Sequence, residues 1–145
     1  MIRIFFSYSH RDEGIRNELE IHMSMLKRQG VIEAWHDRRI LGGSHVDSTI
    51  DANLMTSDLI LLLVSPYFLA SNYCYEIEMQ TALSETAGGR MRVRVLPVIV
   101  EVCDWKNSPL APFLAVPSDG KPISKFPNVH EPLNEVVQEI GRAHV

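Results

Sequence analysis

The chain has 145 residues, of which 46% are hydrophobic and 22% are charged, a composition typical of a single globular domain with a buried core. Its formal net charge of −4 gives no overall attraction to nucleic acid or to an anionic membrane, and no apolar stretch reaches the roughly 18–20 residues of a bilayer span. Two distant cysteines, Cys74 and Cys103, without CxxC spacing, favour a cytoplasmic protein over a disulfide framework or a zinc site. We therefore predict a cytoplasmic protein with no nucleic-acid or membrane partner.

The first third of the chain predicts a strand, a helix and a second strand. Residues 2–7 are mostly apolar, which is typical of a strand covered on both faces. Asp12 is expected to cap a helix whose apolar positions recur at helical spacing until Gly30 ends it. Residues 31–35 predict a short second strand, and a polar, glycine-containing loop leads to a second helix over residues 46–54.

The middle of the chain predicts a strand, a helix and another strand. Residues 58–65 form the clearest buried strand of the sequence. Residues 71–85 follow as a helix with an inward apolar stripe, and a glycine pair ends it. Residues 92–100 predict a strand, in which Pro97 indicates a bulge or an edge position because proline cannot donate to a central ladder.

The last third is rich in proline and predicts mostly loop. We expect a short helix over residues 110–114, a small strand over residues 122–124 and a closing helix over residues 130–142. The alternation of strands and helices predicts right-handed crossovers and a doubly wound α/β sheet, in one domain over residues 1–145.

Ligands of such folds bind beyond the carboxyl ends of the strands. We therefore expect function in the loops that follow Ser7, Trp35 and Ser65. The sequence has no GxGxxG, GxxxxGK[ST] or GxSxG motif, which excludes the usual dinucleotide-fold oxidoreductases, P-loop enzymes and serine hydrolases. The histidines lack HExxH or comparable spacing, so we predict no metal site.

Each group of basic residues has two interpretations, binding of a phosphate or exposure to solvent. We favour exposure to solvent for Lys27, Arg28, Arg90, Arg92 and Arg94. Arg38 and Arg39 lie in a loop at the expected ligand edge, where binding of a phosphate or carboxylate and simple exposure to solvent are equally good interpretations.

Two carboxylates, Glu76 and Glu78, lie in the predicted helix over residues 71–85. Helical residues i and i+2 point about 200° apart, so the two side chains cannot converge on one substrate atom. This excludes a two-carboxylate glycosidase site built from this pair alone. Helical periodicity does not choose between them, because each flanks the apolar stripe at about the same angle. From the residues alone, a solvated helix face remains the alternative to a catalytic role.

Three segments in chain order, FFSYSHRDE, WHDRRILGG and SDLILLLVSPYFLASNYCYEIEM, resemble the TIR domain, especially its bacterial members. The later segment CDWKNSPL is also similar to bacterial members, so the resemblance covers about residues 2–140. It implies a flavodoxin-like sheet of five parallel strands in the order 2-1-3-4-5, with helices on both faces. It also implies a mobile loop after the second strand, here residues 37–44.

TIR domains of one class are adaptors, and those of another class cleave NAD⁺ at the nicotinamide–ribose bond with one glutamate. In the second class that glutamate lies about one helical turn after a cysteine or aromatic residue, and Cys74 and Glu78 stand at i and i+4. The resemblance therefore implies that Glu78 is catalytic, with Glu76 as the fallback. The substrate-binding residues that it implies are Phe6, Ser7, Tyr8, Ser9, Arg39, Ile40, Gly42, Cys74 and Trp105. NAD⁺ is then the substrate, and no cofactor is expected.

The resemblance also implies regulation by assembly. Enzymatic members become active when head-to-tail contacts stack the domains, and such contacts can continue into filaments. We expect the chain to be the N-terminal effector of a longer antiviral defence protein with a C-terminal sensor, or to work with a separate sensor. The alternative function is a non-catalytic TIR–TIR interaction module in signalling.

Overall fold

The structure is a computed structural model that describes residues 2–37, 52–87 and 93–143. Its strands are β1 (Ile2–Ser7), β2 (Ile32–Asp37), β3 (Leu59–Val64) and β4 (Arg94–Ile99). Its α-helices are α1 (Glu13–His22), α2 (Ser24–Arg28), α3 (Ala52–Met55), α4 (Pro66–Ala70), α5 (Gln80–Ala87) and α6 (His130–Ala143). A π-helix, η2, spans Asn72–Met79, and short 3₁₀ helices are η1 (His10–Asp12), η3 (Trp105–Asn107), η4 (Ser118–Gly120) and η5 (Ile123–Lys125).

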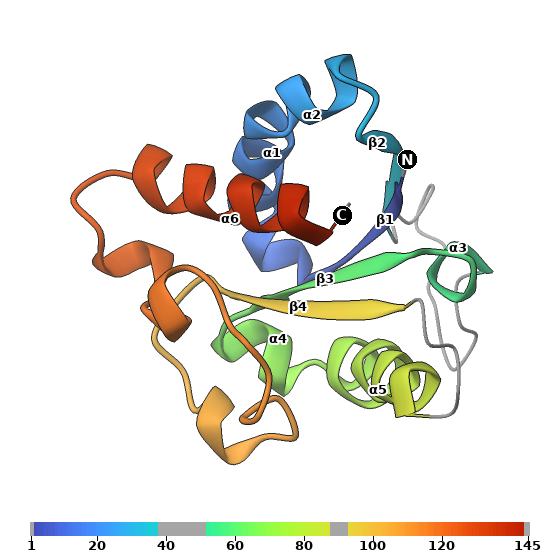
Figure 1. The fold of residues 1–145 in the computed structure, drawn as a ribbon. Helices are drawn as coiled ribbons and strands as arrows, with labels where there is room; N and C mark the ends of the chain where they lie inside the picture. The colour runs from blue at the N-terminus through green and yellow to red at the C-terminus, as the bar shows by residue number, and fades with distance from the viewer. Residues whose placement is uncertain (1, 38–51, 88–92, 144–145) are drawn as a thin grey trace.

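The four strands form one parallel sheet in the order β2-β1-β3-β4, with helices on both faces (Figure 1). This matches the first four positions of the expected order. The described residues contain no fifth strand: at that position, Val116 makes a single parallel bridge with Val98 of β4. The fold class is therefore α/β with a parallel sheet, and the described part of the sheet has four strands.

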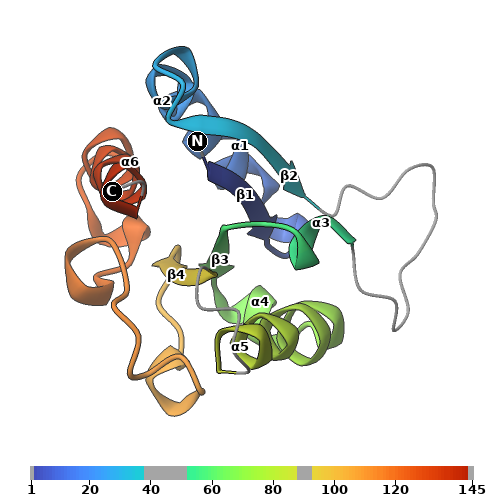
Figure 2. The same cartoon turned by 45° about the vertical axis from the view of Figure 1, so that its right-hand side comes forward.

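Two hydrophobic cores cover the two faces of the sheet. Every residue of β3 is buried, and its side chains alternate between the cores, as expected for a strand covered on both faces. In β1, Phe6 belongs to the first core and Phe5 to the second. Figure 2 shows α1, α2 and α6 on one side of the sheet and α4 and α5 on the other. The first core therefore lies under α1 and α6, and the second lies under α4, η2 and α5.

Several predicted elements differ from the structure. The expected helix over residues 110–114 is a series of turns, and the expected strand over residues 122–124 is the 3₁₀ helix η5. Both errors fall in the proline-rich third, where the few available backbone hydrogen bonds close local turns. The expected helix over residues 71–85 begins as the π-helix η2 and becomes α-helical only at Gln80.

Pro97 lies in the edge strand of the described sheet, one of its two predicted positions. The N–H of Val116 donates to the carbonyl of Pro97 at 3.0 Å, and the N–H of Ile99 donates to the carbonyl of Val116 at 2.8 Å. The backbone N and C=O of one strand residue point to the same side, so the proline nitrogen also faces outward. Pro97 therefore costs no hydrogen bond to β3.

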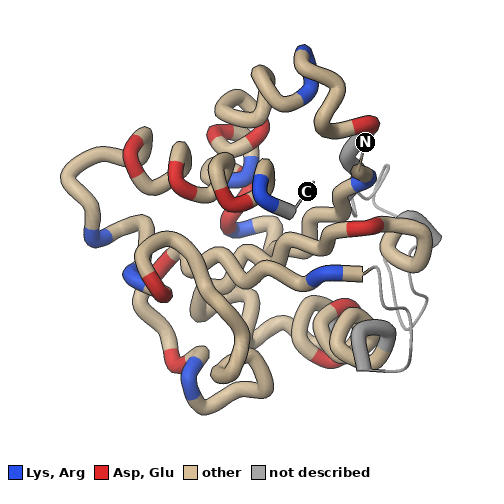
Figure 3. The backbone as a smooth tube through the Cα atoms, viewed as in Figure 1, with Lys and Arg blue, Asp and Glu red and all other residues tan. Residues whose placement is uncertain are grey.

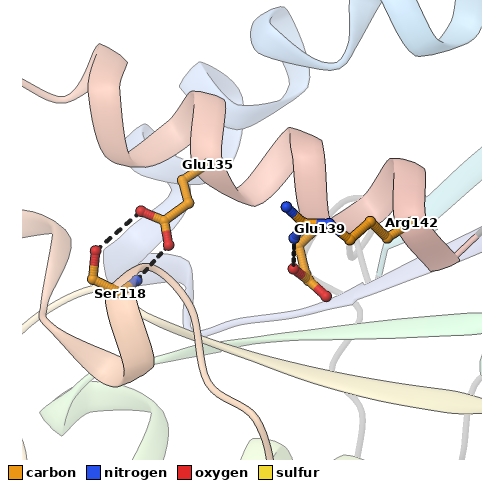
Figure 4. Close-up of polar contacts among 4 residues, drawn as sticks. All are labelled: Ser118, Glu135, Glu139 and Arg142. Carbon is orange, nitrogen blue, oxygen red and sulfur yellow. Dashed lines mark hydrogen bonds and ion pairs between the residues drawn. The ribbon is translucent and has the colours of Figure 1, made fainter.

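The segment after Val116 is fastened to α6 and to η3. Glu135 of α6 accepts hydrogen bonds from the backbone N–H of Ser118 at 2.6 Å and from its hydroxyl at 3.1 Å, as Figure 4 shows beside the ion pair of Glu139 and Arg142. Gly120 has a φ of 103°, and a Cβ at this position would lie 2.5 Å from Cζ2 of Trp105. Only glycine fits both requirements here.

Figure 3 shows the basic residues dispersed over separate elements, which include strands as well as helices and loops. Among the described residues, Lys27 and Arg28 are exposed at the end of α2, and Arg94 is exposed at the start of β4. This agrees with the prediction that these side chains lie on a solvent-exposed surface. Arg38, Arg39, Arg90 and Arg92 lie outside the described residues. In the described part of the chain, none of the helices combines the length and apolar character that crossing a bilayer requires.

Candidate functional site

The topology places a switch point between β1 and β3. From β1 the chain crosses to β2 on one side, and the later strands β3 and β4 lie on the other side. In open α/β sheets, the crevice beyond the carboxyl ends of the strands at this point is the usual ligand site. Ser7, at the end of β1, and Ser65, directly after β3, mark this edge.

Glu78 reaches this edge from the π-helix η2. Its carboxylate Oε1 accepts a hydrogen bond from the Ser7 hydroxyl at 2.5 Å. Ser7 and Glu78 are both fully buried. A buried carboxylate needs partners because its desolvation is costly, and Ser7 supplies one of them. The structure thus joins the family-implied glutamate to one of the family-implied substrate-binding residues, 71 positions away in the chain.

Glu76 points elsewhere, because its side chain is exposed to solvent. The expectation that the two glutamates diverge is therefore confirmed. In a regular α-helix the two residues flank the apolar stripe symmetrically, but η2 has i→i+5 hydrogen bonding and a wider turn. The wider turn rotates each residue by less than 100°, which breaks that symmetry. Glu78 then faces the sheet together with the buried Cys74 and Met79.

The start of η2 is fixed by Ser71. This residue is extended, its hydroxyl accepts from the N–H of Cys74 at 3.1 Å, and its carbonyl accepts from the N–H of Tyr75 at 2.9 Å. A serine N-cap supplies an acceptor for an otherwise orphaned N–H, worth about 1 kcal/mol. π-Helical segments are rare and occur frequently at functional sites. Here the side chain aimed at the sheet is Glu78.

The family model described as TIR domain matches residues 4–126 of this chain. The chain belongs to the TIR family. It is also 50% identical over 143 residues to Uncharacterized protein y4lF of Sinorhizobium fredii (strain NBRC 101917 / NGR234). That match covers 99% of this chain but 44% of the relative, so the chain spans less than half of the relative's length.

The site residues implied for this TIR domain divide between the two faces of the sheet. Ser7, Cys74 and Glu78 lie on the face covered by η2 and α5, and Trp105 is buried in the same core. The structure does not bring two implied residues to that core, namely Phe6 and Tyr8, which are buried in the first core under α1 and α6. The guanidinium of Arg16 lies 5.0 Å from the centroid of the Phe6 ring.

The remaining implied residues lie around the edge or outside the described part. Ser9 is buried at the entrance to η1, where its hydroxyl accepts from the N–H of Arg11 at 3.2 Å. Arg39, Ile40 and Gly42, predicted for the gating loop, lie outside the described residues. Trp105 packs on Gly120, so its position is determined by the fold of the proline-rich segment.

A second buried carboxylate at this edge was not predicted. Asp12 was expected to cap the following helix, but its side chain makes no capping bond to α1. Instead its Oδ2 accepts a hydrogen bond from the Ser65 hydroxyl at 2.5 Å, on the α1 side of the sheet. The Ser65 hydroxyl also accepts from the N–H of Phe68 at 3.1 Å and so caps α4. The position of Ser65 after a buried strand, in a loop singled out from the sequence, was the signal available for this pair.

Burial raises the pKa of Asp12 above its ordinary value, although the Ser65 hydrogen bond and the charge of Arg11 act in the opposite direction. Burial also raises the pKa of the Cys103 thiol, and the carboxylates of Asp104, Glu101 and Asp12 add to this effect. A thiol with a raised pKa holds its proton and is a poor nucleophile. Cys103 is therefore unsuited to covalent catalysis.

The rim of the edge carries a cation–π contact between the elements that follow β1 and β3. The guanidinium carbon of Arg11 lies 4.4 Å from the centroid of the Tyr67 ring, and both side chains are exposed. Such contacts contribute about 0.5–1 kcal/mol at exposed sites. The contact joins η1 to α4 above the Asp12–Ser65 pair.

Proposed function

We propose that this TIR domain cleaves NAD⁺ at the nicotinamide–ribose bond, with Glu78 as the reactive carboxylate. The observation that carries the proposal is the placement of Glu78, held by Ser7 at the carboxyl edge of the sheet beside the switch point. This is the edge at which open α/β folds bind nucleotides. The match to the TIR family supports the proposal, because NAD⁺ cleavage is one of the two activities expected of the family.

The chemistry requires only one carboxylate. The nicotinamide ring of NAD⁺ is a pyridinium. It departs as a neutral heterocycle that takes both electrons of the glycosidic bond, so its departure needs no general acid. The anion of Glu78 then stabilises the developing oxocarbenium ion and accepts hydrogen bonds from ribose hydroxyls. Attack by water gives ADP-ribose with release of a proton. Attack by a nitrogen of the adenine gives a cyclic ADP-ribose.

Burial of Glu78 adds a condition to this proposal. The residue has no exposed surface, so NAD⁺ reaches the carboxylate only after the carboxyl edge opens. We propose that self-association of TIR domains, including contacts that extend into filaments, supplies this opening. A fused or separate sensor would promote the association, in a bacterial antiviral defence acting in the cytoplasm. The relative from Sinorhizobium fredii is more than twice as long as the segment that matches this chain.

A non-catalytic TIR–TIR interaction module is the second candidate, and the same burial favours it. A carboxylate fully buried against a serine also serves to fasten η2 to β1. The two candidates differ in one requirement, since only the enzyme needs NAD⁺ to reach Glu78.

Release of nicotinamide tests the proposal. The chain is incubated with NAD⁺ at high concentration and also clustered on beads through an affinity tag, and nicotinamide is followed by chromatography. We expect release that rises with clustering more steeply than with the amount of protein. The absence of nicotinamide release under every assembling condition would contradict the proposed NAD⁺ cleavage and favour the non-catalytic interaction module. The same chromatograms separate ADP-ribose from its cyclic isomer.

A further inference from the structure

Two histidines from different helices meet on the surface on the α1 and α6 side of the sheet. His22 lies in the last turn of α1, and His130 is the first residue of α6. Nε2 of His22 lies 3.0 Å from Nδ1 of His130, although the two residues are 108 positions apart. The ring centroids are 5.2 Å apart. At this distance one ring donates its N–H to the lone pair of the other.

The backbones that carry these rings are held by buried contacts. Leu19 of α1 and Leu133 of α6 are fully or almost fully buried in the same core. At the start of α6, the side-chain oxygen of Asn128 accepts from the N–H of His130 at 3.0 Å and from the N–H of Glu131 at 3.2 Å. Side chains carried on packed helices are positioned more rigidly than side chains on loops. The approach of the two imidazoles is therefore built into the packing of α1 against α6.

We propose that His22 and His130 form a binding site for a divalent transition-metal ion of the zinc type. Imidazole nitrogen binds Zn²⁺ at about 2.0–2.1 Å, and a tetrahedral angle then places two ligating nitrogens about 3.4 Å apart. The observed 3.0 Å separation needs to widen by only a few tenths of an ångström. In the neutral pair, the donating ring moves its proton to its other nitrogen. Both facing nitrogens then present lone pairs to the ion, and the pair loses no proton overall.

Solvent would supply the other ligands of the ion. The described residues contain no group of three or more His, Cys, Asp or Glu side chains placed to hold a metal, so this part of the chain supplies two protein ligands. Glu18 lies one helical turn before His22, and Glu131 follows His130 in α6, which adds negative charge near the ion. An ion bound only by the folded chain stabilises it and joins α1 to α6. Local spacing such as HExxH does not detect this pair, because its members are far apart in the sequence.

Zinc titration of three variants tests the site. His22→Gln and His130→Gln each remove one ligand from the surface, and His10→Gln is the matched control, since His10 is an exposed histidine in η1 outside the pair. Zn²⁺ affinity is measured by calorimetry, and the zinc-dependent rise in melting temperature is measured in parallel. The histidines that none of these substitutions changes contribute equally to zinc binding by the wild type and by the three variants. We expect each pair variant to bind Zn²⁺ at least about tenfold more weakly, while His10→Gln matches the wild type.

Mg²⁺ serves as the control ion, because it prefers oxygen ligands and should give no rise in melting temperature. Nitrogen-15 NMR of the imidazoles should show His22 and His130 shifting together as Zn²⁺ is added. Equal zinc binding by the wild type and both pair variants would overturn the site. A rise with Mg²⁺ as large as that with Zn²⁺, or a loss of zinc binding in His10→Gln as large as in the pair variants, would overturn it as well.

Discussion

The two faces of the sheet carry the same local arrangement at their carboxyl edge. On one face Ser7 donates to Glu78, and on the other Ser65 donates to Asp12, each at 2.5 Å and each in a buried setting. The pairs differ in what the serine also does. Ser65 caps α4 through the N–H of Phe68, whereas the Ser7 pair joins β1 to a π-helix. We infer that the Asp12 pair serves the fold and that the Glu78 pair serves the reaction.

The largest effect that separates the two pairs is on activity. Glu78→Gln keeps the shape of the side chain and an acceptor for Ser7 but removes the negative charge that the oxocarbenium ion needs. We expect nicotinamide release from clustered protein to fall about a hundredfold or more. Asp12→Asn makes the same chemical change on the other face, and we expect it to keep activity within about threefold. Equal losses in the two variants would contradict the division of roles.

The next largest effect is on stability and concerns Ser65. Ser65→Ala removes the helix cap and the hydrogen bond to buried Asp12, and each contributes about 1 kcal/mol. We expect the free energy of unfolding, from urea denaturation, to fall by about 2 kcal/mol. Ser124→Ala removes an exposed hydroxyl that donates to Glu101 and should change this free energy by less than about 0.5 kcal/mol.

Ser7→Ala should show the reverse balance between stability and activity. It removes one hydrogen bond to Glu78, so we expect a loss of about 1 kcal/mol in the free energy of unfolding. Without Ser7 the carboxylate is less well positioned, and we expect nicotinamide release to fall about tenfold. A stability loss larger than that of Ser65→Ala, with activity unchanged, would show that Ser7 serves the fold.

The smallest effect is the pH dependence of the Asp12 pair, and its sign is the test. Because the pKa of Asp12 is raised in the folded state, the folded chain binds this proton more tightly than the unfolded chain does. The stability that this group contributes is present below its unfolded-state pKa and is lost as pH rises through the folded-state pKa. Urea denaturation should therefore show wild type losing stability relative to Asp12→Asn as pH rises above the ordinary aspartate pKa of about 4. A relative gain would contradict the assignment of Asp12 as a desolvated carboxyl.

The strands of the fold were predictable from sequence because burial on both faces leaves a continuous apolar run. β1 has the predicted bounds of residues 2–7, and β3 lies within the predicted residues 58–65. The proline-rich segment was not predictable in the same way. Its structure depends on distant contacts such as those of Ser118 with Glu135, which no local pattern contains.

The site was predictable in part for the same reason. The family resemblance pointed to Glu78, but α-helical periodicity was symmetric about the two glutamates. The π-helix that breaks this symmetry depends on tertiary packing and on the Ser71 cap. Asp12 was assigned to a helix cap because its sequence position suits one. The competing hydrogen bond from Ser65 comes from a residue 53 positions away.

The most direct measurement compares Glu78→Gln with Glu76→Gln under identical clustering, with nicotinamide release as the readout and far-ultraviolet circular dichroism as the check on folding. The two substitutions make the same change two residues apart, once on the buried side of η2 and once on its exposed side. Glu78 as the reactive carboxylate predicts that Glu78→Gln abolishes release while Glu76→Gln retains it. Release that survives Glu78→Gln but is lost in Glu76→Gln would contradict this assignment.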